Sequence, residues 1–155
     1  MSREFTSFRE YLSEATKGVT FAFGRFNPPT SGHEVLFNKV KSLSGGGAYR
    51  IYPSQTQDKK KNHLDFKVKV KFLRKMFPKH ARNIMADKGM RTAFDVVTAL
   101  YDQGYVECTM VVGEDRLIEF DKLLHKYNNV KGRHGFYNFK VLKVVSAGAR
   151  DPDAD

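Results

Sequence analysis

The sequence predicts an α/β fold in which a parallel β-sheet of about five strands carries helices on both faces. Three observations support this prediction: apolar runs alternate with amphipathic helical patterns, most connections are short, and glycine or proline marks the boundaries. Such alternation favours parallel strands, because each helix returns the chain to the same end of the sheet. With 155 residues, the chain is long enough for one domain with a sizeable core.

The expected strands are apolar runs bounded by turn residues. They span residues 19–23, 48–52, 83–86, 106–112 and 139–145. Gly24 ends the first run and Pro53 closes the second, whereas the third run is the weakest of the five. This order is typical of a Rossmann-like, doubly wound sheet, whose ligands bind beyond the carboxyl ends of the strands.

Four helices are expected between these strands, over residues 33–43, 66–77, 91–103 and 116–127. In the second helix, Phe66, Val70, Leu73 and Phe77 fall on one stripe, and basic residues occupy the other faces. Gly104 stands where the third helix needs a C-terminal cap.

The composition indicates a soluble protein with an anionic partner. The net charge is +10, and ten of the 24 residues from Lys59 to Arg82 are Lys or Arg, although a solvated helix face would also explain that run. No apolar run approaches the roughly 18–20 residues that span a bilayer, so we expect a cytoplasmic location and no membrane partner. Cys108 is the only cysteine, which excludes an internal disulfide and provides no metal-ligand spacing.

The segment Gly24-Arg25-Phe26-Asn27-Pro28-Pro29-Thr30-Ser31-Gly32-His33 directly follows the first strand. Ser31 and Glu34 have the spacing of a capping box, which predicts that a helix begins here. His33 would lie in the first turn, where backbone N–H groups and the helix dipole attract anions, and Gly32 would let a phosphate approach the backbone. His33 would donate a hydrogen bond to a phosphate oxygen. A capped helix start with an incidental histidine is the alternative.

This segment resembles the strand-one signature of the HxGH-motif nucleotidyltransferase superfamily, Gly-x-Phe-(Asp/Asn)-Pro-x-(His/Thr)-x-Gly-His. Thr30 stands where most members have the first histidine, and the matching residues are Gly24, Phe26, Asn27, Pro28, Gly32 and His33. The resemblance implies catalytic roles for His33 and Thr30. It also implies nucleotide binding by Gly24, Arg25, Phe26, Asn27, Gly32 and His33.

Three further segments are similar to parts of this superfamily. The loop after the second strand looks like the one that holds acceptor and phosphates, which implies binding by Ser54, Thr56, Lys60, Lys61 and Asn62. Lys69 falls where nicotinamide-nucleotide adenylyltransferases carry a phosphate-binding arginine, which implies a catalytic role. After the fourth expected strand, a segment resembles the one that contacts the nucleoside, with Gly113, Asp115 and Arg116 as binding residues.

The resemblance implies transfer of AMP or CMP from ATP or CTP to a small phosphorylated acceptor, with release of pyrophosphate. Nicotinamide mononucleotide is the first acceptor to test, and phosphopantetheine or a sugar phosphate remains open. Mg²⁺ is expected to bridge the phosphates with few protein ligands, and no residue is assigned to it. The superfamily's second signature, Ser-x-(Thr/Ser)-x-x-Arg, is absent, so the chain is either part of a longer protein or has lost half of its triphosphate clamp.

Residues 1–17 form a separate segment before the domain of residues 18–155, and their apolar residues have helical spacing. They could pack on the domain as a helix. The segment also resembles the capsid-targeting peptides of proteins packaged in tailed-phage heads, which implies cleavage after Glu14. The competing function is therefore a non-catalytic protein, packaged with phage capsid or associated with DNA through its basic surface.

Overall fold

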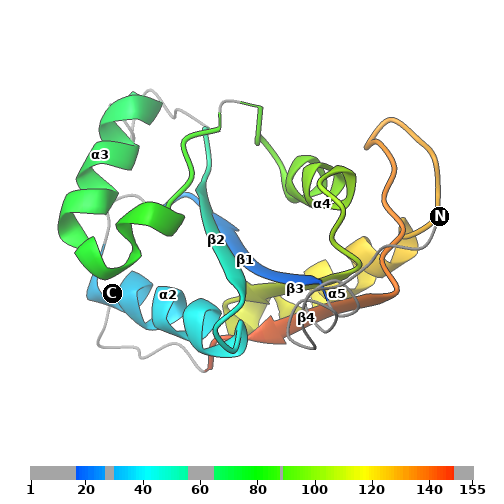
Figure 1. Cartoon of the computed structure of the whole chain (residues 1–155), viewed down its shortest axis with the longest axis horizontal. Helices are drawn as coiled ribbons and strands as arrows, with labels where there is room; N and C mark the ends of the chain where they lie inside the picture. The colour runs from blue at the N-terminus through cyan, green and yellow to red at the C-terminus, as the bar shows by residue number, and fades with distance from the viewer. Residues whose placement is uncertain (1–16, 27–29, 56–64, 88, 149–155) are drawn as a thin grey trace, which may run out of the picture.

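The computed structural model describes residues 17–26, 30–55, 65–87 and 89–148. Its four parallel strands lie in the order β2-β1-β3-β4 (Figure 1). Their bounds are β1 Gly18–Gly24, β2 Ala48–Pro53, β3 Glu107–Val112 and β4 Val141–Ser146. The predicted Rossmann-like architecture is confirmed, whereas the segment 1–16 with the expected cleavage point lies outside the described residues.

The sheet has four strands rather than five, because the weak run 83–86 does not form one. Ile84 makes a single parallel bridge to Ile51, and the Met85 N–H donates to the Ile51 carbonyl at 2.8 Å. A 3₁₀ helix, η1 (Pro78–Asn83), ends immediately before Ile84. The stretch after η1 is therefore too short to form a fifth strand, and only Ile84 pairs with β2.

The helices lie close to where the sequence predicts them. Their bounds are α2 Ser31–Leu43, α3 Phe66–Met76, α4 Ala93–Asp102 and α5 Leu117–Lys126, with a short 3₁₀ helix η2 at Glu114–Arg116. The third expected helix is shorter than predicted because Thr92 caps α4, accepting a hydrogen bond from the Asp95 N–H at 3.2 Å. Gly104 follows the end of α4 with a φ of 97°, as a C-terminal cap requires.

Two apolar clusters fill the two faces of the sheet, because successive strand residues point to opposite sides. Val19 and Phe21 of β1 pack with α4, α5 and β4, whereas Ala22 packs with α2 and α3. Figure 1 shows α2 and α3 toward the β2 end of the sheet, and α4 and α5 toward its β4 end. Because α4 and α5 cover one face of the sheet and α2 and α3 cover the other, the sheet is doubly wound.

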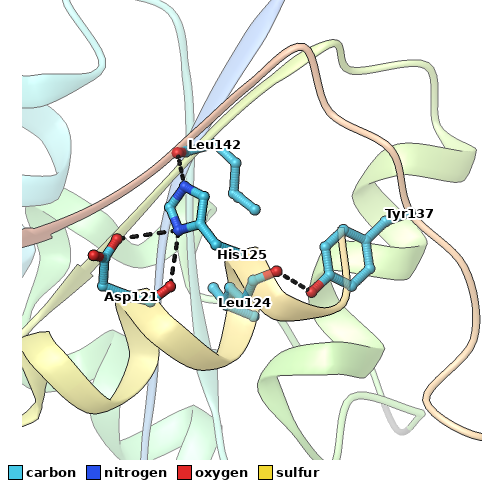
Figure 2. Close-up of polar contacts among 5 residues, drawn as sticks. All are labelled: Asp121, Leu124, His125, Tyr137 and Leu142. Carbon is cyan, nitrogen blue, oxygen red and sulfur yellow. Dashed lines mark hydrogen bonds and ion pairs between the residues drawn. The ribbon is translucent and has the colours of Figure 1, made fainter. Parts of the chain in front are cut away.

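Polar contacts fix α5 to β4 and to the segment that connects them (Figure 2). The His125 ring bridges the two elements: Nε2 lies 2.8 Å from the Leu142 carbonyl, and Nδ1 lies 2.8 Å from the Asp121 carbonyl. The buried Tyr137 hydroxyl donates to the Leu124 carbonyl at 2.6 Å. These contacts hold the end of the sheet that is farthest from β2.

Candidate functional site at the carboxyl edge of the sheet

The turn after β1 has an uncommon backbone conformation. Phe26 has a φ of 48°, which is rare for a bulky residue, yet its side chain is buried and packs against Phe37 at a ring-centroid distance of 5.1 Å. The Phe26 ring folds back over Gly24, where an added Cβ would lie 2.9 Å from the ring. A side chain at this position would force the buried ring to shift, which favours glycine. Such strained turns are concentrated at functional sites.

The N-cap of helix α2 lies one residue earlier than the sequence predicts, because Thr30 and not Ser31 is the N-cap, and the helix begins at Ser31 rather than at His33. The expected Ser31–Glu34 capping box is wrong, since the third helical residue is His33. The Thr30 N–H donates to His33 Nδ1 at 3.0 Å. Because Nδ1 accepts this bond, the neutral imidazole carries its proton on Nε2. The His33 ring, which accepts the N-cap hydrogen bond at Nδ1, therefore carries an N–H donor at Nε2 in the first turn of α2.

His33 also packs on the strained turn. Its ring lies edge-on to Phe26 at a centroid distance of 5.3 Å. The turn after β1 and the start of α2 are thus parts of one arrangement, and the conformation of Phe26 places the imidazole. Helix N-termini such as this one attract anions, and Gly32 lies in the same first turn.

Lys69 approaches the same sheet edge from α3. Its side chain is only 2% exposed, and Nζ donates to the Ser54 carbonyl at 2.9 Å. Ser54 in turn donates its N–H to the Gly24 carbonyl at 2.7 Å, which joins the segments after β1 and β2. Burial lowers the pKa of the Lys69 amine, and the positive charge of Arg25 lowers it further. The Ser54 hydroxyl is buried, and no hydrogen-bond partner for it is found within the described part of the chain.

These contacts place two cations, a buried hydroxyl and a helix N-terminus at the carboxyl ends of β1 and β2. None of the hydrogen bonds or ion pairs of the described residues joins Arg25 or Lys69 to a carboxylate. Such a site favours an anionic ligand with several oxygen atoms, because each of these groups can donate a hydrogen bond.

The segment after β3 lies at the same edge of the sheet. Gly113 precedes η2, and a Cβ added to it would lie 2.9 Å from Asp115 Oδ1. Asp115 and Arg116 are exposed, and Arg116 pairs with Glu119 at 3.4 Å. Five further predicted site residues lie outside the described residues: Asn27, Thr56, Lys60, Lys61 and Asn62. Their roles stay predictions.

One contact at this edge has no signal in the sequence. Gln55 Nε2 donates to the Asp87 carbonyl at 2.7 Å, which ties the segment after β2 to the one after Ile84. The Lys69–Ser54 bond is equally unexpected, since the resemblance assigns both residues to ligand binding. Neither partner is close in sequence, so only the folded chain shows these pairs.

Comparison with known proteins supports a relationship to the nucleotidyltransferase superfamily. The chain is 26% identical over 116 residues to a probable nicotinate-nucleotide adenylyltransferase from Thermosipho melanesiensis, over 72% of this chain and 58% of that protein. The chain therefore spans less than two thirds of the length of this relative. No protein-family model matches the chain.

A solved structure from Vibrio parahaemolyticus, also named provisionally as a nicotinate-nucleotide adenylyltransferase, shares the fold. Its TM-score is 0.54 at 14% identity, covering 86% of this chain and 80% of that one. At this level of identity the likeness concerns the fold alone. Within the described part of the chain, no helix is long and apolar enough to cross a membrane.

Proposed function

We propose that this chain binds a nucleoside triphosphate and transfers its nucleotidyl group to a small phosphorylated acceptor. The observation that supports this most directly is the start of α2, where the Thr30 N–H donates to His33 Nδ1, so that the neutral ring carries its proton on Nε2. This donor lies in the first turn of a helix at the carboxyl end of β1, where a doubly wound sheet binds its ligands.

The proposed reaction is an in-line displacement at the α-phosphorus. A phosphate oxygen of the acceptor forms a new bond to the α-phosphorus while the bond to the bridging oxygen breaks, and pyrophosphate leaves with that oxygen. No covalent intermediate with the protein is needed. The task of the protein is to position two polyanions and to stabilise the charge that develops on the leaving group.

Each group at the edge has a part in this scheme. The His33 Nε2–H and the backbone N–H groups of α2 would contact the triphosphate, and Thr30 would keep the imidazole in place. Lys69 and Arg25 add positive charge, and the Lys69–Ser54 bond fixes the segment after β2 against that site. Gly113, Asp115 and Arg116 are proposed to contact the nucleoside.

The names of the two similar proteins specify nicotinate mononucleotide as a further acceptor to test. We therefore place the pyridine mononucleotides first, in both the nicotinate and the nicotinamide form. Either would present a phosphate to the α-phosphorus, and ATP is the donor that an adenylyltransferase uses.

Magnesium belongs to the same proposal. Among the described residues, no group of three or more His, Cys, Asp or Glu side chains is placed to hold a metal ion. A magnesium ion that enters on the triphosphate would take most of its oxygen ligands from the phosphates and water, which is its usual behaviour. When bound it would neutralise phosphate charge.

The test combines turnover with direct binding. The protein is incubated with ATP or CTP, Mg²⁺ and each acceptor, and both pyrophosphate and the dinucleotide product are measured. We expect His33→Ala to lower kcat/KM by about 10²–10³-fold, the usual loss for one donor to a developing charge. Glu34→Ala is the matched control, because it changes the next residue of the same turn and should leave turnover close to that of the unmodified chain.

Two outcomes would count against the proposal in different ways. ATP binding without product from any acceptor would refute transfer and leave nucleotide binding in place. No ATP binding, together with an affinity for duplex DNA that falls steeply with salt, would favour the non-catalytic, DNA-associated alternative.

A further inference from the structure

The outer side of α3 carries an apolar ridge that no part of the core uses. Val68, Phe72 and Met76 are spaced four residues apart, so they lie along one side of the helix. Their exposed fractions are 47%, 53% and 42%. Isolated exposed apolar residues are ordinary, but an aligned row on one helix is typical of a surface that meets a partner.

A row of lysines runs beside this ridge. Lys67, Lys71 and Lys75 have the same spacing, shifted by one residue, and all three are exposed. Beyond this lysine row lies a groove of about 480 Å³. The groove has an apolar floor of Phe66, Val70 and Ala86, and its rim consists of the lysine row and Arg74. The surface therefore alternates between apolar, cationic and apolar strips.

Arg74 gives the groove a fixed wall. Its Nε and Nη2 both donate to the Ile84 carbonyl, at 3.2 Å and 2.6 Å. This carbonyl belongs to the segment that pairs with β2, so the guanidinium is held against the sheet edge. The groove is thus bounded by groups that the fold already positions.

The lysine row is unfavourable for α3 taken alone. Like charges four residues apart repel each other, and Lys67 lies in the first turn, where the helix dipole disfavours a cation. Helix α3 contains no acidic residue, and none of its exposed cations takes part in the ion pairs found among the described residues. A local electrostatic cost of this kind is expected where a surface binds something anionic.

We propose that this face of α3 docks an acidic amphipathic helix of a partner protein. Its apolar side chains would fill the groove and cover the ridge, and its carboxylates would meet the lysine row. A nucleic acid would pair with the lysines but leave both apolar strips exposed. A flat membrane would not fill the groove, and a second copy of this chain would place one lysine row against another. The lysine row lies on the side of α3 opposite the buried Lys69, so these lysines are separate from the proposed reaction.

The test uses a fluorescent helical peptide of about 15 residues, long enough to be partly helical alone, with glutamates and leucines on adjacent faces. A peptide of the same composition with the two residue types scrambled is the matched control. We expect only the amphipathic peptide to bind. Phe72→Ser and Lys71→Glu should each weaken binding by about tenfold, as loss of a central contact does. Lys122→Glu, an exposed site on α5, should not change it.

Several results would overturn this inference. Equal binding of the scrambled peptide, or an affinity unchanged by Phe72→Ser, would show that charge alone is recognised. Binding of duplex DNA or of phosphatidylcholine–phosphatidylserine vesicles in place of the peptide would identify a different partner. The far-UV circular dichroism spectrum and the Tm of Phe72→Ser without nucleotide should match those of the unmodified chain, which shows that the variant folds and keeps this result independent of the proposed function.

Discussion

Lys69 shows how one buried side chain links the core to the proposed site. A lysine that is 2% exposed has lost most of its hydration, and its hydrogen bond to the Ser54 carbonyl offsets only part of that cost. Burial and the charge of Arg25 both lower the pKa of the amine, which means that the fold disfavours the ammonium form. Retaining a charge here is easier to explain by ligand binding than by stability.

This reasoning predicts that Lys69→Met keeps or raises the free energy of unfolding, because replacing a buried charge with an apolar side chain of similar length is often neutral or stabilising by about 1–4 kcal/mol. The advantage of methionine should shrink as the pH rises through the lowered pKa of the Lys69 amine toward its ordinary value of 10.5, because the folded chain then loses the proton before the unfolded chain does. Urea unfolding across this pH range measures both effects.

The same variant should lose part of its stabilisation by ATP, measured as the shift in Tm at saturating nucleotide. A purely structural lysine would give the opposite pattern, with lower stability in Lys69→Met and an unchanged shift. Lys69→Arg, which keeps the charge, is the companion variant.

The turn after β1 is the element that shapes the candidate site. The left-handed Phe26 directs its ring over Gly24 and against His33, so a change at the glycine should be transmitted to the imidazole. The start of α2 depends on the same geometry, since the Thr30 N–H donates to the His33 ring and that ring packs against Phe26.

We expect Gly24→Ala to destabilise the protein by about 1–3 kcal/mol, the usual cost of adding a methyl group to a packed site. The reason is the 2.9 Å approach of the new Cβ to the Phe26 ring. Gly89→Ala is the control, because a Cβ there has no neighbour within 4 Å and the change should stay within about 0.5 kcal/mol. Chemical denaturation of both variants tests this, and equal stabilities would contradict the packing argument.

At the scale of the whole molecule, His80 joins three elements on one face of the sheet. Its ring is 1% exposed, with Nδ1 3.0 Å from the Tyr49 hydroxyl and Nε2 2.8 Å from Asn38 Oδ1. These partners suit a neutral ring that accepts from Tyr49 and donates to Asn38. Burial lowers the pKa of His80, Lys41 and Lys79 lower it further, and Glu34 acts in the opposite direction.

The stability of the fold should therefore decrease in acid. In the unfolded chain His80 takes up a proton near its ordinary pKa of about 6.5, whereas the folded chain resists protonation to a lower pH. Its contribution is complete above about pH 6.5 and is lost as the pH falls below that value. The unmodified chain should lose stability more steeply than His80→Gln between about pH 6.5 and pH 5. Parallel pH profiles would show that another group is responsible.

The sequence by itself was sufficient for the order of the helices and strands that form, and it predicted where the candidate site lies. Hydrophobic period and turn residues are local, so β1, β2, α3 and the doubly wound arrangement could be predicted from them. The sequence could not show whether the weak run at 83–86 forms a strand, because that depends on how many residues remain after η1 ends at Asn83.

Only the tertiary structure decided how the site residues meet. The sequence placed a cap at Ser31, but in the folded chain the Thr30 N–H donates to the His33 ring and the cap lies one residue earlier. It also marked Lys69 and Ser54 as ligand contacts, whereas the fold joins them to each other across two elements. The physical reason is that periodicity and turn chemistry act between near neighbours, while the pairing of buried polar groups depends on which distant segments the packed sheet brings together.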